Sequence, residues 1–129
     1  MKDLRGKVAF ITGGAQGIGL GMARAMKQEG AVLVLVDVDQ AALDAARDEL
    51  GAHTCVLDVR DRDEYARIVD EVESTIGPIA ILCNNAGVGG GASVRSMTYE
   101  MWDWVLGVNN GGVVNGIQTI VPRMVERGE

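Results

Sequence analysis

The sequence predicts an α/β protein built on a doubly wound parallel sheet. Four short apolar runs alternate with helical patterns, and each strand–helix unit takes about 20 to 30 residues. Polar residues do not interrupt these runs, which is typical of parallel strands that are covered by helices on both faces. The first run leads into a glycine-rich turn and the second ends on an acidic residue, as in a nucleotide-binding βαβ unit.

The first unit runs from a strand at residues 8–12 to a second strand at residues 31–36. The first apolar run is too short for a helix and stops at a threonine followed by two glycines. Gly30 ends the helix between the strands, as a glycine just past the last turn usually does. The predicted buried face of this helix consists of apolar residues at helical spacing, Ile18, Met22, Ala25 and Met26.

The turn after the first strand has residue types that suit a bound diphosphate. Helix N-terminal amides lack intrahelical partners and lie at the positive end of the helix dipole. Glycine at 17 and 19 would let a diphosphate approach those amides, because no Cβ stands in the way. Asp37, at the end of the second strand, can accept hydrogen bonds from ribose hydroxyls and would repel a 2′-phosphate. An ordinary tight turn without a ligand is the alternative. A triphosphate-binding P-loop fits worse, since no Gly-Lys-Ser/Thr is present.

Two further strand–helix units follow. We expect a helix at residues 40–50 that Gly51 ends, and a third strand at residues 53–57. The predicted apolar side of this helix consists of Ala41, Leu43, Ala45, Ala46 and Leu50. Asp61 can cap the next helix, which extends to about residue 76. Its predicted buried stripe is Tyr65, Ile68, Val69, Val72 and Ile76.

The fourth strand is predicted at residues 79–83, and a glycine-rich loop at residues 88–96 follows its end. Thr98 then caps a single long helix that reaches to about Arg127. Several glycines lower the intrinsic helicity of its middle part. Glycines spaced in this way usually allow another backbone to come close, so we interpret them as a packing face. The Rossmann precedent predicts strand order 3-2-1-4 for the resulting partial sheet.

Composition limits the possible functions. The 129 residues suffice for one domain at most, and a net charge of −6 argues against a nucleic-acid partner. Cys55 and Cys83 lie in apolar runs, so we expect reduced thiols and no disulfide. No apolar stretch is long enough to span a membrane, and residues 1–7 leave no room for a targeting peptide, so a cytoplasmic protein is expected. His53 is the only histidine and has no companion ligand, so no metal site is predicted.

Four motifs together resemble the short-chain dehydrogenase/reductase family. The first is the turn Thr12-Gly13-Gly14-Ala15-Gln16-Gly17-Ile18-Gly19, whose spacing is T-G-x-x-x-G-x-G. The second and third are Asp58-Val59 after the third strand and Asn84-Asn85-Ala86-Gly87 after the fourth. The fourth is Val108-Asn109, with Gly112 three residues on. Because the motifs occur in the family's order and spacing, the resemblance covers essentially the whole chain.

The resemblance implies an NAD(P)-binding Rossmann-type domain at residues 1–129 and assigns roles to individual residues. The Asp58 carboxylate would meet the adenine amino group, and Asn109 would hold a water in a proton relay as the one catalytic residue present. Asp37 favours NAD over NADP. The cofactor-binding residues implied are Gly13, Gln16, Gly17, Ile18, Gly19, Asp37, Asp58, Val59, Asn85, Ala86 and Gly87.

The chain departs from the family pattern at two places. Asn110-Gly111 stands where bulky apolar residues are common, which weakens packing there and leaves the local geometry of the helix open. The family's catalytic serine, tyrosine and lysine have no counterparts. Tyr65 and Tyr99 are followed four residues later by Val69 and Asp103, and no lysine lies beyond Lys27.

Three interpretations follow from these departures. The chain resembles the N-terminal part of an NAD-dependent oxidoreductase that acts on an alcohol or carbonyl, with its catalytic residues on further sequence. It could instead be a non-catalytic dinucleotide-binding module, or a non-functional fragment whose fourth strand is an exposed edge. Whether the 129 residues alone are an enzyme stays open.

The last helix carries apolar residues that suggest self-association. Trp102, Val105, Val113 and Ile117 can form a helix-to-helix contact between subunits, as the family resemblance also implies. Packing of the same residues within one domain is the alternative.

Overall fold

A computed structural model describes residues 3–129. Met1 and Lys2, which belong to the N-terminal segment discussed above, lie outside the described residues. The strands form one parallel sheet in the order β3-β2-β1-β4, which confirms the predicted fold class and strand order. The strands are β1 (Val8–Thr12), β2 (Val32–Asp37), β3 (His53–Val56) and β4 (Ile79–Cys83). The helices are α1 (Gly17–Gln28), α2 (Gln40–Leu50), α3 (Arg62–Thr75), α4 (Tyr99–Leu106), the π-helical η1 (Gly107–Gly111) and α5 (Gly112–Glu126).

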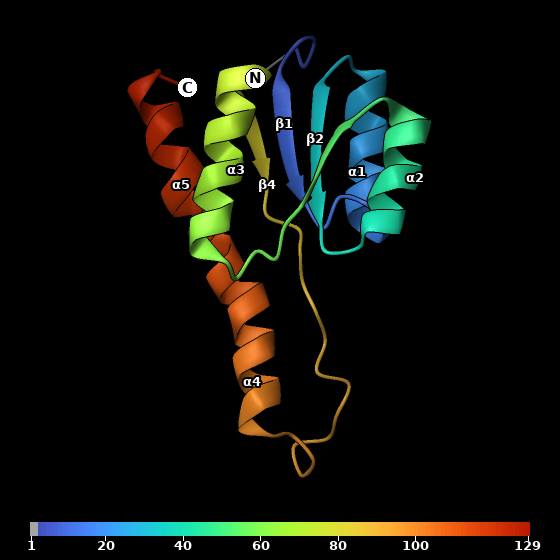
Figure 1. Ribbon diagram of the computed structural model, residues 1–129, viewed down its shortest axis with the longest axis vertical. Coiled ribbons are helices and arrows are strands. Elements are labelled where there is room, and N and C mark those ends of the chain that lie inside the picture. The colour runs from blue at the N-terminus through green and yellow to red at the C-terminus, as the bar shows by residue number, and fades with distance from the viewer. Residues whose placement is uncertain (1–2) are drawn as a thin grey trace.

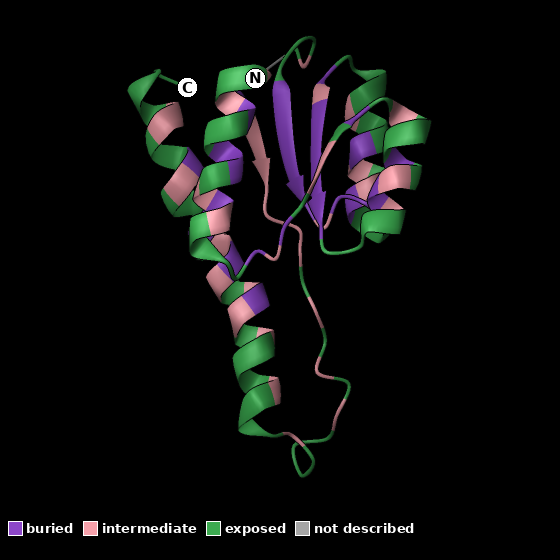
Figure 2. Cartoon of the chain, viewed as in Figure 1, coloured by how far each residue is buried: buried purple, intermediate pink, exposed green. Residues whose placement is uncertain are grey.

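Helices cover both faces of the sheet (Figure 1). Helices α1 and α2 lie on one face and α3 and α5 on the other, while α4 extends beyond the carboxyl ends of the strands. Side chains of β1 alternate between the two layers: Val8 and Phe10 pack toward α3 and α5, and Ala9 and Ile11 pack toward α1 and α2. Strands β1 and β2 are therefore almost wholly buried, whereas the flanking β3 and β4 are partly exposed (Figure 2).

The predicted buried stripe is confirmed for the four residues within α3, with Ile76 half-buried just after the helix, and it is wrong in part for the first two helices. In α1 the buried residues are Gly19 and Ala23, while Ala25 is exposed and Ile18 is 78% exposed. Gly19 faces inward because a Cβ there would collide with the Gly13 carbonyl oxygen and come within 2.6 Å of Asn85 Nδ2. In α2, likewise, Leu43 and Ala46 are buried, and the predicted Ala41 and Ala45 are exposed.

The long last helix is interrupted, which corrects the prediction of one regular helix. Thr98 caps it as predicted, its hydroxyl accepting a hydrogen bond from the Met101 amide at 3.2 Å. The segment η1 then adds a π-helical turn, which has wider hydrogen-bond spacing than an α-helix. Its sequence, Gly-Val-Asn-Asn-Gly, is poor in helix formers and includes the Asn110-Gly111 departure noted above.

The glycines after this turn form the predicted packing face. A Cβ on Gly112 would stand 2.5 Å from Val59 Cγ2, and one on Gly116 would stand 2.8 Å from the Tyr65 hydroxyl. Gly116 also lies against the side-chain oxygen of Asn84. Only glycine lets α5 approach α3 and the end of β4 this closely.

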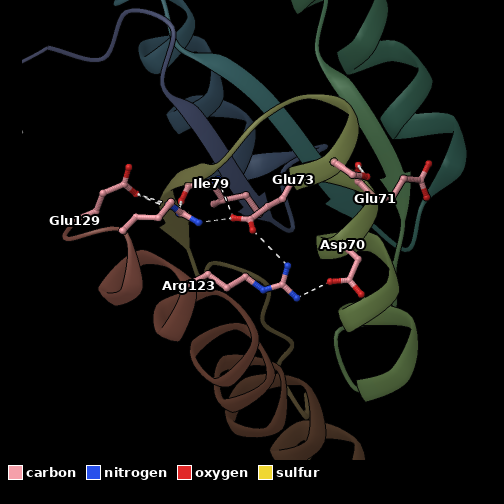
Figure 3. A network of polar contacts seen from close by, with 8 residues as sticks. Asp70, Glu71, Glu73, Ile79, Arg123 and Glu129 are labelled. Carbon is pink, nitrogen blue, oxygen red and sulfur yellow. Dashed lines mark hydrogen bonds and ion pairs between the residues drawn. The ribbon is translucent and has the colours of Figure 1, made fainter.

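Ion pairs fasten the far end of α5 to α3 and β4 (Figure 3). Glu73 on α3 accepts hydrogen bonds from the Ile79 amide at 3.1 Å, Arg127 at 3.0 Å and Arg123 at 3.3 Å. Arg127 also donates to the Ile79 carbonyl at 2.7 Å, and Arg123 donates to Asp70. Because Glu73 is only 17% exposed, water screens these contacts less than an ordinary surface pair.

The cysteines match their prediction, and the described helices are short. Both Cys55 and Cys83 are free thiols, and they pack into the two opposite layers of the core. Burial raises the pKa of each thiol. Within residues 3–129, none of the helices has the length and apolar character that crossing a bilayer requires.

Candidate nucleotide-binding site

A pocket of about 540 Å³ lies at the carboxyl ends of the strands, where open α/β sheets usually bind ligands. Of the predicted cofactor-binding residues, all except Gly17 and Gly19 line it. The predicted catalytic residue Asn109 does not. The lining residues are Gly13, Gln16, Ile18, Asp37, Val38, Leu57, Asp58, Val59, Arg60, Asn85, Ala86, Gly87, Val88, Trp104 and Val108.

The glycine turn leaves several backbone amides beside this pocket without an acceptor among the described residues. Gln16 precedes α1 in an extended conformation, and its side chain does not cap the helix. Within the described residues, no protein acceptor pairs with the amides of residues 17–19, and the first helical bond runs from Leu20 to the Gln16 carbonyl. Gly17 has φ +57°, which an L side chain rarely adopts, and open space surrounds its Cβ position. This arrangement suits an anion.

Gly19 has a packing role in addition to the phosphate access predicted for it, which stays a prediction. The missing Cβ makes room for the Gly13 carbonyl and the Asn85 amide, so Gly19 sets how closely α1 approaches β1 and β4. Its backbone amide is still one of those at the start of α1.

Asp37 holds its carboxylate against the same turn. One carboxylate oxygen accepts from the Ala15 amide at 3.3 Å and the other from the Asp39 amide at 3.2 Å. The residue is only 8% exposed and lines the pocket. These two bonds orient the carboxylate while leaving further lone pairs for hydroxyl donors.

A hydroxyl joins the end of β1 to the end of the edge strand β4. Thr12 Oγ1 donates to the Cys83 carbonyl at 3.2 Å and accepts from the Asn85 and Ala86 amides, each at 3.0 Å. The Asn85 side chain returns the contact by donating to the carbonyls of Thr12 at 3.0 Å and Gly13 at 3.2 Å. The segment Asn85-Ala86-Gly87 is thereby fixed beside the glycine turn.

The segment after β3 is held from both sides. The Asp58 carboxylate pairs with the Arg60 guanidinium, with Nη2 and Oδ2 2.7 Å apart, and the hydrogen bonds of that side chain hold the pKa of Asp58 below its ordinary value. The Val59 carbonyl accepts from the buried Asn115 side chain at 2.8 Å. These contacts place the loop against α5 and η1.

Asn109 acts as a clamp in this structure. Its side-chain oxygen accepts from the Val88 amide at 2.8 Å, and its side-chain nitrogen donates to the Val88 carbonyl at 2.9 Å. The pair of bonds ties η1 to the backbone that follows β4. The asparagine therefore shapes the pocket wall through Val88, which lines it.

Sequence reasoning missed six residues of the lining. Arg60 directly follows the Asp58-Val59 motif, and Val38 directly follows Asp37, so extending each motif by one residue would have found both. Trp104 and Val108 stand four residues apart across the start of η1, and helical spacing offers a weak signal for such a pair. Leu57 and Val88 carry no signal beyond adjacency to motifs. The missed set is Val38, Leu57, Arg60, Val88, Trp104 and Val108.

Among the described residues, no tyrosine or lysine that could form the family's acid/base pair lines the pocket. Tyr65 is fully buried in the core, 5.8 Å from Phe10 between ring centroids, and burial raises its pKa. Tyr99 is 91% exposed at the start of α4. Ser93 pairs with Ser96 in the loop before α4 and does not line the pocket. Within residues 3–129, no cluster of metal-ligating side chains is present.

The comparison with known protein families decides the identity at the family level. The sequence profile described as short chain dehydrogenase matches residues 7–129, which is almost the entire chain. The chain belongs to the short-chain dehydrogenase family. This agrees with the motif order and with the strand order of the partial Rossmann sheet.

Two curated family members illustrate the extent of the match. The C alpha-dehydrogenase of Sphingobium sp. strain SYK-6 is 46% identical over 99% of this chain and 44% of its own length. The 3-oxoacyl-[acyl-carrier-protein] reductase FabG of Thermotoga maritima is 38% identical over 96% of this chain and 52% of its own length. The chain therefore spans about half the length of these relatives and corresponds to their N-terminal portion.

Solved structures of family members superpose closely. The apo form of LigO from Sphingobium sp. strain SYK-6 is 42% identical with a TM-score of 0.95, over 100% of this chain and 50% of that one. A Burkholderia phymatum short-chain dehydrogenase in complex with NAD is 36% identical with a TM-score of 0.92, over 100% of this chain and 48% of that one. A metagenomic short-chain oxidoreductase in complex with NADP is 31% identical with a TM-score of 0.90, over 96% of this chain and 59% of that one. Short-chain dehydrogenases thus bind either dinucleotide.

The hydrogen bonds of the Thr12 hydroxyl with Cys83, Asn85 and Ala86, here called the Thr12 link, can be tested by Thr12→Val. This substitution keeps the shape of the side chain and removes the hydroxyl. We expect a loss of about 1–3 kcal/mol in unfolding free energy, because the Asn85 and Ala86 amides lose their shared acceptor. Urea unfolding measures it. Thr54→Val on β3 is the matched control, since the Thr54 side chain makes no hydrogen bond within the described residues. Equal stability losses for the two variants would contradict the link.

Proposed function

We propose that residues 1–129 are the dinucleotide-binding part of an NAD-dependent oxidoreductase that acts on an alcohol or carbonyl substrate. The observation that carries the proposal is a pocket where unpaired amides at the start of a helix lie beside a fixed carboxylate. The amides suit a diphosphate and the carboxylate suits ribose hydroxyls. Family membership supports the reaction class.

Different groups of pocket residues would contact different parts of the dinucleotide. Gly13 and residues 16–19 would hold the diphosphate at the start of α1. Asp37 would accept from the adenosine ribose, and Asp58 with Val59 would meet the adenine. Asn85-Ala86-Gly87 would border the nicotinamide half, because the Thr12 link holds this segment beside the glycine turn.

The preference for NAD over NADP rests on charge at the end of β2. A 2′-phosphate placed there would approach the Asp37 carboxylate, which its two amide bonds keep in place. The next residue, Val38, offers no positive charge in compensation. Bringing two anions together in a partly buried site is unfavourable.

The contribution of the chain to catalysis is binding and positioning. NAD, when bound, supplies the ring carbon that accepts or gives the hydride. Asn109 fixes the wall beside it through its two bonds to Val88. The role of Asn109 in a proton relay is also a proposal: its side-chain oxygen has a second lone pair, which can accept a hydrogen bond from a water.

A non-catalytic dinucleotide-binding module is the second candidate function. The absence of a catalytic tyrosine–lysine pair from this sequence favours it for the 129 residues taken alone. Binding without turnover would support the module, and binding with turnover by a longer chain would support the oxidoreductase. A non-functional fragment is the remaining possibility, and it predicts no binding at all.

Cofactor preference should depend on Asp37. We expect Asp37→Ala to narrow the difference in affinity between NAD and NADP, because the repulsion of the 2′-phosphate disappears. Calorimetric titration with both dinucleotides measures it, and Asp48→Ala, an exposed site outside the pocket, is the control. Tighter binding of NADP than NAD by the unaltered chain would refute the preference.

The isolated 129-residue chain should show no hydride transfer with any alcohol and either nicotinamide cofactor. An alcohol must lose its proton as the hydride departs, which requires a base poised near the working pH within hydrogen-bond reach. The ionisable residues of the pocket are Asp37, Asp58 and Arg60, all assigned to the adenosine half. Formation of reduced cofactor, followed by absorbance, is the measurement. Robust turnover by a sample free of host dehydrogenases would overturn this expectation.

Self-association through the last helices is a further proposal. Trp102 is 46% exposed and Ile117 is 48% exposed, and Val105 and Val113 are half-buried. Covering these apolar side chains with a second copy would remove them from water. We expect sedimentation to show a concentration-dependent dimer that Ile117→Lys weakens. A strictly monomeric profile at high concentration would instead favour a role confined to one domain.

A further inference from the structure

We propose that Arg60 is a positioning residue of the nucleotide pocket, which holds the Asp58 carboxylate as a fixed acceptor for the amino group of adenine. The inference rests on the proposed function, because it names what selects the base in the same pocket. It concerns a residue outside the four sequence motifs.

The contact between Arg60 and Asp58 constrains the carboxylate in several directions. Arg60 Nε lies 3.0 Å from Oδ1 and 3.1 Å from Oδ2, and Nη2 lies 2.7 Å from Oδ2. The Arg60 backbone amide adds a bond of 3.0 Å to Oδ1. A planar guanidinium that pairs with both oxygens fixes the plane of the carboxylate, which a single point charge would not do.

Arg60 is itself supported by the helix that forms the opposite wall. A Cβ on Gly107 would stand 3.0 Å from Arg60 Cδ, so the absence of a side chain there lets the arginine stem lie on the first residue of η1. Trp104 and Val108, on either side of Gly107 in the chain, line the same pocket as Arg60. The arginine therefore bridges the loop after β3 and the helical wall.

The loop backbone is also held in place immediately after Asp58, between the carboxylate and Arg60. Val59 packs against Gly112, and its carbonyl accepts from Asn115 at 2.8 Å. Asp58 is thus held by a backbone that cannot drift and by a side chain that cannot rotate freely. Because Asp58 lines the pocket, its carboxylate lies where a donor from a bound ligand can reach it.

A fixed carboxylate distinguishes purine bases by the group at one ring position. The exocyclic amino group of adenine donates hydrogen bonds, which the Asp58 carboxylate accepts. Hypoxanthine carries a carbonyl oxygen at that position, and two acceptors facing each other cannot form a bond. A carboxylate that is free to turn would avoid the carbonyl, so discrimination requires the positioning that Arg60 supplies.

The test compares NAD with nicotinamide hypoxanthine dinucleotide, which differs from it only in the base. Binding of each is measured by calorimetry to the unaltered chain, Arg60→Met, Asp58→Asn and the double variant. Arg62→Met is the matched control, because Arg62 is an exposed arginine two residues away that does not line the pocket. Arg60 has 45% of its side chain exposed, so its replacement leaves the core intact, and circular dichroism checks this.

We expect Arg60→Met to raise the Kd of NAD about threefold to tenfold. This is the entropic effect expected when the Asp58 side chain, no longer held by Arg60, must become ordered on binding. The Kd of the hypoxanthine dinucleotide should not rise, because the freed carboxylate can turn away from the carbonyl, so the ratio between the two Kd values falls. In the Asp58→Asn background the same change should have little further effect, because Arg60 acts through the carboxylate. Arg60→Lys, which keeps the charge without the planar fork, should recover only part of the preference.

Three results would overturn the inference. Equal weakening of both dinucleotides by Arg60→Met would indicate a general structural or electrostatic role, as would an equal effect of Arg62→Met. Unchanged binding of NAD by Arg60→Met would remove its role altogether. Failure of the unaltered chain to bind any dinucleotide would overturn the proposed function itself, which distinguishes the two failures.

Discussion

The hydrogen bonds of the Thr12 hydroxyl are the interaction on which the site depends most. They connect the end of β1 to the end of β4 and to the segment Asn85-Ala86-Gly87. The two strands are separated in sequence by two complete strand–helix units, so no local interaction could set their relative height. Because Asn85 returns bonds to the carbonyls of Thr12 and Gly13, the glycine turn and the motif after β4 form one rigid edge.

Close packing by residues without side chains determines where the helices lie relative to this edge. Gly19 brings α1 against Gly13 and Asn85, and Gly112 and Gly116 bring α5 against Val59 and Tyr65. At each place a methyl group would force the elements apart in a core that is already densely packed. The Tyr65 hydroxyl and the Asn84 side-chain oxygen meet at Gly116 without a hydrogen-bond partner in the described residues. Both atoms lie where α5 packs most closely against α3 and the end of β4.

The π-helical turn η1 connects this packing to the pocket. It presents Asn109 to the Val88 backbone, Gly107 to Arg60 and Val108 to the pocket wall. Helix irregularities of this kind are often found at functional sites, because they redirect side chains without breaking the helix. The regular helix predicted across residues 99–127 would not show this local change of direction.

The sequence by itself determined the order of elements, their bounds to within a residue or two for most of the chain, and the motifs that meet at the strand ends. These features depend on short-range physics: apolar runs, caps such as Asp61 and Thr98, and glycine where φ is positive. Only the tertiary structure decided that Ile18 stays out of the core, that Gly19 packs against Gly13 and Asn85, that the last helix contains a π-turn and that Arg60 and Trp104 complete the pocket wall. Each of these features depends on contacts between residues distant in sequence. Where two elements approach closely at a glycine, that glycine turns inward, and the buried face of the helix rotates with it.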